Sequence, residues 1–289
     1  MHLIDSHAHL DMIPADRLPG VLQRAWSAEV RTILAIGIGE GPGTMHQALE
    51  LADSLAGADS HTPAVYASAG IHPQQAGQAT PDALARLATL AARPRCLAVG
   101  EIGLDFYHAD NPDLLAQHSA FVAQLEIAAA ARKPILIHCR TSELARPDAK
   151  ARYGTADAWQ DLLALLALHW QPHGLPGIMH CFSGTVEQAR RSLDLGFLLS
   201  FAGNLTYPAA TPIREAAAFA PADRILVETD APFLAPIPLR GQTNESAYVA
   251  HTAAALARLR AIPLEELAAR TTANFHTLFP STAPQAQSA

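Results

Sequence analysis

The chain has 289 residues, of which 49% are hydrophobic, and carries a formal net charge of −7 at pH 7. This length can bury the core of one α/β barrel or of two ordinary domains. The acidic balance excludes a broad basic surface that coats duplex DNA through many phosphate contacts. An anionic substrate would therefore have to be held locally, by metal ions and a few arginines.

The sequence also argues against export and membrane attachment. It contains no run of about 18 uncharged apolar residues, as a transmembrane helix requires. The N-terminus lacks the basic stretch and long apolar core of a signal peptide. Three cysteines in a chain of this length imply no disulfide framework. We therefore expect a cytoplasmic protein, and no feature of the sequence indicates an obligate protein partner.

Short β-rich runs alternate with long Ala/Leu-rich stretches of helical character. The cores of the β-rich runs, such as 33–36 and 135–137, are continuously apolar, which is typical of strands buried on both faces of a parallel sheet. The helical stretches are exemplified by 113–131, which follows Pro112 as a helix-start signal. Strands are expected at 3–7, 31–38, 65–70, 97–102, 135–139, 177–182, 197–202 and 225–230.

Eight strand–helix units in a chain of this size predict an α/β fold of the (β/α)8 TIM-barrel type over residues 1–279. A doubly wound open sheet is the alternative. It would need a glycine-rich phosphate-binding loop after the first strand, and the sequence has none there. Residues 280–289 have too few large apolar side chains to pack, so we expect a disordered tail.

The spacing departs from that of a minimal barrel after the fifth strand. The stretch from His138 to His180 is longer than one helix and two short loops require. We expect an insertion at about 140–176, whose polar part over 140–153 lies across the C-terminal face of the barrel. We interpret its basic residues as an anion-holding rim, although an ordinary solvated loop is the alternative for the last three of them. These residues are Arg140, Arg146, Lys150 and Arg152.

Polar residues with metal-ligand chemistry recur at the ends of the predicted strands. His7 and His9 lie one residue apart, so strand alternation places both imidazoles on one face. Imidazole is the commonest metal ligand of proteins, and this pair can form half a metal site. A single histidine at a strand end is more often structural, but seven such residues on one barrel rim predict an active site. The other five are His72, Glu101, His138, His180 and Asp230.

The predicted ligands, four histidines, one glutamate and one aspartate, are too many for one catalytic zinc site, which keeps three protein ligands and an open position. They suit two divalent ions, Mg²⁺, Mn²⁺ or Zn²⁺, about 4 Å apart and sharing a carboxylate. Glu101 is central in strand order and is the expected bridge. A carboxylated lysine could bridge two such ions instead. That option is missing here, because Lys133 precedes strand five and Lys150 lies in the insertion.

Sequence segments along nearly the whole chain resemble the signatures of the TatD family. They are 5–9, 70–73, 100–105, 137–140, 180–185, 228–234, Arg240-Gly241, Asn244-Glu245 and Asn274-Phe275. The resemblance implies a metal-dependent hydrolase of the amidohydrolase-like barrel class, usually a deoxyribonuclease that acts on phosphodiester bonds. It also implies which residues hold each ion. One ion would be held by His7, His9, Glu101 and Asp230, and the other by Glu101, His138 and His180.

The chain departs from the family pattern where the substrate would rest. Thr141-Ser142 stands where the family often has Asp, and the insertion that follows is longer than usual. The metal site is therefore better specified by the sequence than the substrate is. Phe106 and Tyr107, which follow strand four, either stack a base at the rim or simply pack.

The predicted function is a two-metal phosphodiesterase, a DNase that works as a 3′-5′ exonuclease on single-stranded or frayed DNA ends. Asp230 is the expected acceptor of the proton of the attacking water, beside Glu101. His72 and Arg140 are the expected ligands of the non-bridging phosphate oxygens. Hydrolysis of another ester, such as an aminoacyl ester, or of a C–N bond is the enzymatic alternative. A nucleic-acid-binding protein without catalysis is a third possibility, against which the acidic balance and the intact ligand set both count.

Overall fold

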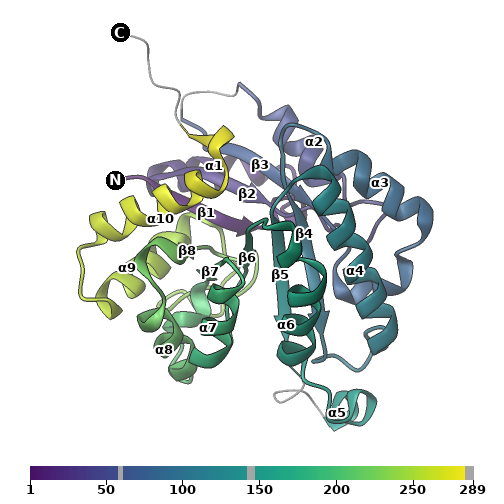
Figure 1. The fold of residues 1–289 in the computed structure, drawn as a ribbon. Coiled ribbons are helices and arrows are strands. Elements are labelled where there is room, and N and C mark those ends of the chain that lie inside the picture. Colours follow the sequence, from purple (N-terminus) through teal and green to yellow (C-terminus); the bar gives the residue numbers. More distant parts are fainter. Residues whose placement is uncertain (58–60, 142–146, 284–289) are drawn as a thin grey trace.

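The computed structural model describes residues 1–57, 61–141 and 147–283. Its strands form one sheet in which each strand is paired in parallel with the next in sequence (Figure 1). The strands are β1 (Leu3–Ala8), β2 (Val30–Ala35), β3 (Ala64–Ala69), β4 (Cys96–Asp105), β5 (Ile135–Arg140), β6 (Gly177–Met179), β7 (Phe197–Phe201) and β8 (Ile225–Val227).

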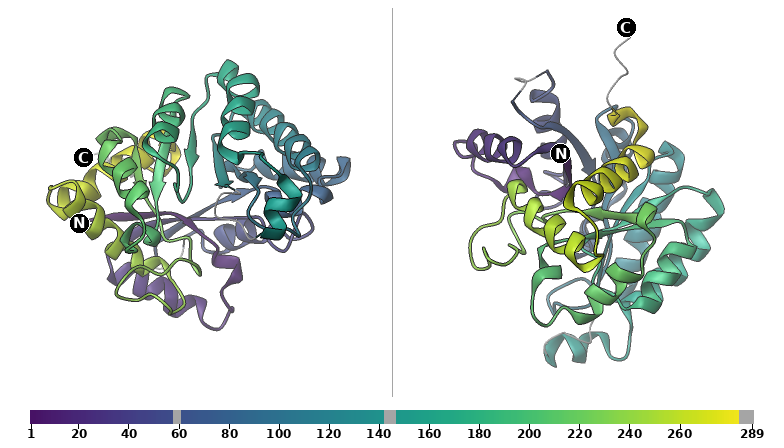
Figure 2. Two further views of the ribbon diagram at one scale, coloured as in Figure 1. Left: turned by 90° about the horizontal axis from the view of Figure 1, so that it is seen from below. Right: turned by 90° about the vertical axis from the view of Figure 1, so that its left-hand side faces the viewer.

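The helices lie outside the strands, as the turned views of Figure 2 also show. The predicted (β/α)8 barrel is confirmed, and the doubly wound alternative is wrong because the strand order follows the sequence order around the whole sheet. The helices are α1 (Leu18–Ser27), α2 (Gln47–Ser54), α3 (Pro81–Ala91), α4 (Leu114–Ala131), α5 (Pro147–Tyr153), α6 (Ala158–His169), α7 (Val186–Asp194), α8 (Thr211–Phe219), α9 (Val249–Leu259) and α10 (Leu264–Leu278).

The ring of strands closes between β1 and the residues that follow β8. The amide of Asp230 donates to the carbonyl of His7 at 2.9 Å, and the amide of His9 donates to the carbonyl of Ala231 at 2.7 Å. Below this closure, the buried carboxylate of Asp5 accepts hydrogen bonds from the amide and hydroxyl of Thr229, at 2.9 and 2.7 Å. Backbone bonds therefore bring the two ends of the barrel, and the polar side chains on them, together.

The predicted ends of four strands need correction by three residues. β2, β6 and β8 each end three residues earlier than expected, so His180 and Asp230 follow their strands and do not lie within them. For β6 and β8 the reason is local. Cys181 and Asp230, which follow these strands, adopt the left-handed conformation, with φ of 42° and 58°. β4 instead runs three residues further, to Asp105. At Gly103 a Cβ would lie 1.9 Å from the carbonyl oxygen of His138, so only glycine allows this close pairing with β5.

The predicted insertion contains the short helix α5, which lies beyond the C-terminal ends of β4 and β5 at the bottom of Figure 1. α5 is not a solvated loop, since Tyr153 is buried and its hydroxyl donates to the carbonyl of Pro112 at 3.0 Å. Lys150 and Arg152 are exposed on it. Ser142 and Arg146 lie outside the described residues, so the basic rim is described only in part.

The beginning of the predicted tail is ordered. Pro280–Thr282 form a 3-10 helix, and the buried Thr282 hydroxyl lies 2.8 Å from Nδ1 of His276. The expectation of disorder was wrong here because buried Phe279, which packs on Phe275, anchors the chain just before this turn. Residues 284–289 lie outside the described part of the chain. None of the described helices is long and apolar enough to cross a membrane, and the cytoplasmic location stays a prediction.

Candidate active site

The carboxylate of Glu101 lies at the centre of the C-terminal mouth of the barrel, and its two oxygens face different histidines. Oε1 is 2.7 Å from Nδ1 of His138 and 2.9 Å from Nε2 of His180. Nε2 of His72 lies 3.6 Å from the same oxygen. Three histidines, from the ends of three strands, thus surround one oxygen of one buried carboxylate.

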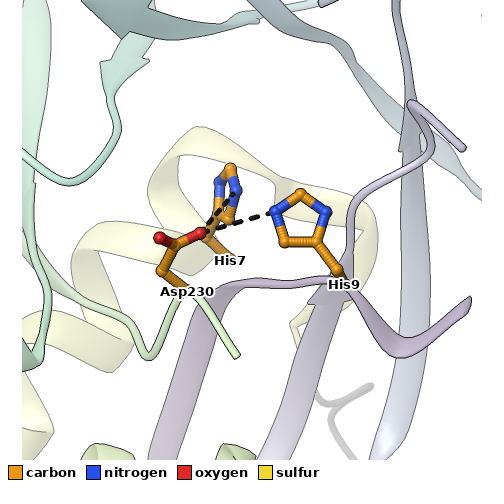
Figure 3. Close-up of side chains that lie close together, drawn as sticks. All are labelled: His7, His9 and Asp230. Carbon is orange, nitrogen blue, oxygen red and sulfur yellow. Dashed lines mark ion pairs between the residues drawn. The ribbon is translucent and has the colours of Figure 1, made fainter. Parts of the chain in front are cut away.

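The second oxygen of Glu101 faces the place where the barrel closes. Oε2 lies 3.5 Å from Nε2 of His7 and 3.9 Å from Nε2 of His9. Both histidines also approach Oδ1 of Asp230, at 3.7 and 3.4 Å (Figure 3). The H-x-H pair presents both rings to one point, as strand alternation predicts. Glu101 therefore stands between two groups of side chains, with one oxygen toward each.

The local sequence around Glu101 explains its position. A Cβ at Gly100 would lie 2.6 Å from Cβ of Leu136, so a residue with any side chain would push β4 away from β5. Glu101 itself is 3% exposed. Burial is the largest influence on its carboxyl and raises the pKa, but the charges of His180 and His72 and the hydrogen bonds of nearby histidines together hold the pKa well below its usual range. The carboxylate is therefore ionised.

Two further carboxylates lie behind the histidines around Oε1. Nε2 of His138 faces Oδ2 of Asp105 at 3.4 Å, and Nδ1 of His180 lies 3.0 Å from Oε1 of Glu228. A carboxylate that accepts the N–H of one ring nitrogen fixes the tautomer and leaves the other nitrogen with a free lone pair. These contacts therefore leave Nδ1 of His138 and Nε2 of His180 as the nitrogens that can bind a metal.

The outer nitrogen of His72 faces a hydrogen-bond donor, whereas those of His138 and His180 face carboxylates. Its Nδ1 accepts a hydrogen bond from the amide of Gln74 at 3.2 Å, at the start of the 3-10 helix Pro73–Gln78. Burial, the largest influence, lowers the pKa of His72, so the ring is neutral. A neutral ring that accepts at Nδ1 carries its proton on Nε2. His72 consequently presents an N–H, and not a lone pair, to the centre of the site.

Asp105 and Glu228 are the residues to which sequence reasoning gave no role, although both stand in the segments that resemble the family. A signal was present in the spacing, since Glu228 precedes Asp230 by two positions and Asp105 follows Glu101 by four. Both spacings are those of residues on one face of a strand. Glu228 is fully buried and accepts a second hydrogen bond from the amide of Cys181 at 2.7 Å.

The ionisation of this group follows from its contacts. Burial, the largest influence, disfavours the charged forms, but it is outweighed by the hydrogen bonds and charges of the partners. The pKa of His138 is raised to about 9 by Asp105 and Glu101, and the pKa of Asp105 is lowered to about 2 by His138. The pKa of His180 is likewise raised well above its usual value by Glu101 and Glu228. The metal-free site is thus a network of charged pairs.

The donor set fits divalent metal ions. Both ring nitrogens of His7 and Nδ1 of His9 are buried and have no hydrogen-bond partner among the described residues. Buried nitrogens of this kind are costly unless something binds them. Within each of three groups, the ligand atoms lie within 4.8 Å of one another. The groups are His7, His9 and Asp230; His7, His180 and Glu228; and His72, Glu101 and His138.

The aromatic and basic residues near the mouth divide into packing and rim positions. Phe106 is buried and stacks on Tyr153 with ring centroids 5.0 Å apart, so it packs and cannot stack a base. Arg140 is exposed at the end of β5. Its guanidinium lies 3.5 Å from the centroid of the Tyr107 ring, and Nη1 is 3.3 Å from Nε2 of His108. Among the described residues, Arg140 forms no hydrogen bond or ion pair with the histidine and carboxylate cluster, so its role as a phosphate ligand stays a prediction.

Comparison with known proteins identifies the family. The model of the family described as TatD related DNase matches residues 4–280. The chain belongs to the TatD family of metal-dependent hydrolases. The family inferred from the signature segments is thereby confirmed. The six proposed ligands and His72 of this TatD-family chain all lie at the mouth described above.

The relatives of this TatD-family chain match it along nearly its full length. A protein of Escherichia coli K12 named uncharacterized metal-dependent hydrolase YcfH is 36% identical, with 100% of this chain and 99% of that protein covered. The 3′-5′ ssDNA/RNA exonuclease TatD of Salmonella typhimurium is 34% identical over 90% and 91% of the two chains. Among solved structures, the TatD homologue YjjV of Escherichia coli K12 has a TM-score of 0.81 at 29% identity and covers 98% of each chain.

Proposed function

We propose that this hydrolase cleaves phosphodiester bonds at the ends of single-stranded DNA with the help of two divalent ions. The observation that carries the proposal is the position of Glu101, whose two oxygens face two separate groups of histidines. A shared carboxylate between two ligand groups is the arrangement expected of a two-metal hydrolase. The name of the Salmonella relative, an exonuclease of single-stranded DNA and RNA, supports the choice of bond.

The proposed ligands form two groups on either side of the Glu101 carboxylate, and each group could hold one divalent ion. Divalent ions at a paired centre supply Lewis acidity, which activates water near neutral pH and offsets the charge that develops on phosphate oxygens. Glu228 orients the ring of His180 by accepting a hydrogen bond from Nδ1, and the carboxylate of Asp105 forms an ion pair with Nε2 of His138 at 3.4 Å. One ion would be held by His7, His9, Glu101 and Asp230, and the other by Glu101, His138 and His180.

Asp230 is the group that accepts the proton of the attacking water. Burial, the largest influence, raises the pKa of Asp230, but a hydrogen bond from His9 and the charges of His180 and His7 lower it below the usual value. The carboxylate is therefore ionised and available as an acceptor. It is also more exposed than Glu101, with 14% and 4% of the two side chains accessible, so solvent can carry the proton away.

His72 and Arg140 hold the phosphate group. The proton that Gln74 fixes on Nε2 of His72 points to the centre, where it can donate to a non-bridging oxygen. Arg140 brings a planar cation to the end of β5, whose geometry matches a phosphate. With a net charge of −7, the protein gains little from the many phosphates of a long duplex, which favours single-stranded or frayed ends.

The test combines metal analysis with substrate profiling. The purified protein is expected to hold two divalent ions per chain after reconstitution, and to shorten a single-stranded oligonucleotide from its 3′ end faster than it cleaves a closed duplex circle. Amides and aminoacyl esters serve as competing substrates for the same centre. One ion per chain, equal cleavage of circle and free end, or faster hydrolysis of an amide or aminoacyl ester would overturn the proposal.

A further inference from the structure

An exposed aromatic ring stands beside the candidate metal site, in the loop that follows β8. Among the described residues, seven large apolar side chains are exposed, and Phe233 is 51% exposed. Met12 and Ile237, each 43% exposed, lie in the segments that follow β1 and β8. His7 lies near the end of β1, and His9 and Asp230 follow β1 and β8. Exposed apolar surface therefore borders this side of the mouth.

Phe233 lies directly against a predicted metal ligand. Its ring packs edge-on against the ring of His9, with centroids 5.8 Å apart and planes inclined at 73°. Nε2 of that histidine lies 3.4 Å from Asp230. The phenyl ring thus contacts a residue that would bind the ion, and about half of Phe233 is open to solvent.

The backbone that carries the ring is firmly held. The amide of Phe233 donates to the carbonyl of Asp230 at 2.8 Å, and its carbonyl accepts from Nδ2 of the buried Asn244 at 2.6 Å. The next residue packs on Gly203, where a Cβ would lie 2.1 Å from the carbonyl oxygen of Leu234. A fixed backbone with a half-exposed ring presents a surface that is ready to bind, at little cost in conformational entropy.

We propose that Phe233 stacks on the nucleobase next to the scissile phosphodiester. Aromatic side chains bind any base through its π-face, and a base must be unpaired to present that face. The candidate of the sequence analysis, Phe106, is buried, and the ring of Tyr107 is covered on one face by Arg140. The inference rests on the proposed function and adds the feature that selects unpaired ends.

The test compares oligonucleotides that do and do not carry the base. Wild-type protein is expected to cleave a normal single-stranded 3′ end with a kcat/KM about 5- to 150-fold higher than that of the same strand with an abasic end. Phe233→Ala should remove this difference, with unchanged metal content and unchanged cleavage of the abasic end. Phe233→Trp should keep it, and Phe233→Leu should lose most of it, since leucine has no π-face.

A binding measurement gives a readout that does not depend on turnover. A single-stranded oligonucleotide with phosphorothioate linkages and 2-aminopurine at its 3′ end is expected to lose fluorescence on binding to the metal-loaded wild type, and to lose less on binding to Phe233→Ala. The matched control is Phe219→Ala. Phe219 is 38% exposed at the end of α8, with the guanidinium of Arg190 4.8 Å from its ring centroid, and its removal should change neither measurement.

The outcomes separate this inference from the proposed function. If the wild type cleaves normal and abasic ends equally, Phe233 is not a stacking residue, although the phosphodiesterase function stands. If Phe233→Ala slows both substrates equally or loses metal, the ring supports the metal site, and the inference is wrong. If the wild type cleaves neither substrate and the 2-aminopurine signal does not change on binding, the function and the inference both fail.

Discussion

His138 and His72 approach the same oxygen of Glu101, but their surroundings prepare them for different tasks. The outer nitrogen of His138 faces the carboxylate of Asp105, whereas the outer nitrogen of His72 accepts the amide hydrogen of Gln74. An acceptor behind a ring leaves a lone pair in front, and a donor behind it leaves a proton in front. The comparison teaches that the partner behind a histidine decides whether it serves as a ligand or as a donor.

The largest effect is expected from the residue that joins the two groups. Glu101→Ala removes a ligand from both ions at once, so the variant should lose more metal than any single histidine variant. Its loss of activity should exceed the roughly 10- to 100-fold that follows removal of an orienting partner. Mass spectrometry measures the metal content of the variants. The control is Glu187→Ala, at an exposed position of α7. Two ions retained in Glu101→Ala would show that the carboxylate is no bridge.

The assignment of His72 as a donor is tested by separating activity from metal content. His72→Ala should lower kcat/KM by about 100- to 1000-fold, the usual cost of losing one donor to a developing charge, and keep both ions. His72→Gln, whose amide can donate, should recover part of the activity. His138→Ala is the matched comparison and should lose metal. Loss of metal from His72→Ala would contradict the distinction between the two rings.

Replacing the carboxylates behind the ligands should have a smaller effect. Asp105→Asn and Glu228→Gln keep the shape of the side chain but remove the strong acceptor, so metal affinity should fall about 10- to 100-fold in each variant. Titration with a chelator that competes for the ion measures this change. Both variants should remain folded by circular dichroism. An affinity equal to that of the wild type would mean that the acceptors do not set the ring tautomers.

The smallest effect concerns the pH dependence of metal binding. Because the pKa of His138 is raised to about 9, this ring carries a proton at neutral pH in the metal-free protein, and an ion must displace it. Apparent affinity should therefore rise with pH, by up to about tenfold per unit for each proton released, and level off above pH 9. Calorimetry in buffers of different ionisation enthalpy counts the protons. His72, whose pKa is lowered, should contribute none.

The sequence predicts the barrel and the convergence of seven polar residues because both follow from short-range rules. Continuous apolar runs mark buried parallel strands, and in a barrel the residues after each strand share one rim. The spacing of Glu228 from Asp230 marks it as a candidate site residue but does not predict its task, because the ring that it contacts, His180, lies 48 positions away. The early ends of β6 and β8, before Cys181 and Asp230, could not be predicted for another reason, because left-handed backbone at non-glycine residues has no strong sequence signal.

The closure of the ring between β1 and the residues after β8 has a consequence for synthesis of the protein. His7 and His9 emerge from the ribosome long before Asp230 and before Thr229, which binds Asp5 from 224 positions later in the chain. Domains fold as units, and contacts this distant in sequence form only after the intervening chain has collapsed. A nascent or prematurely terminated chain therefore lacks a complete metal centre.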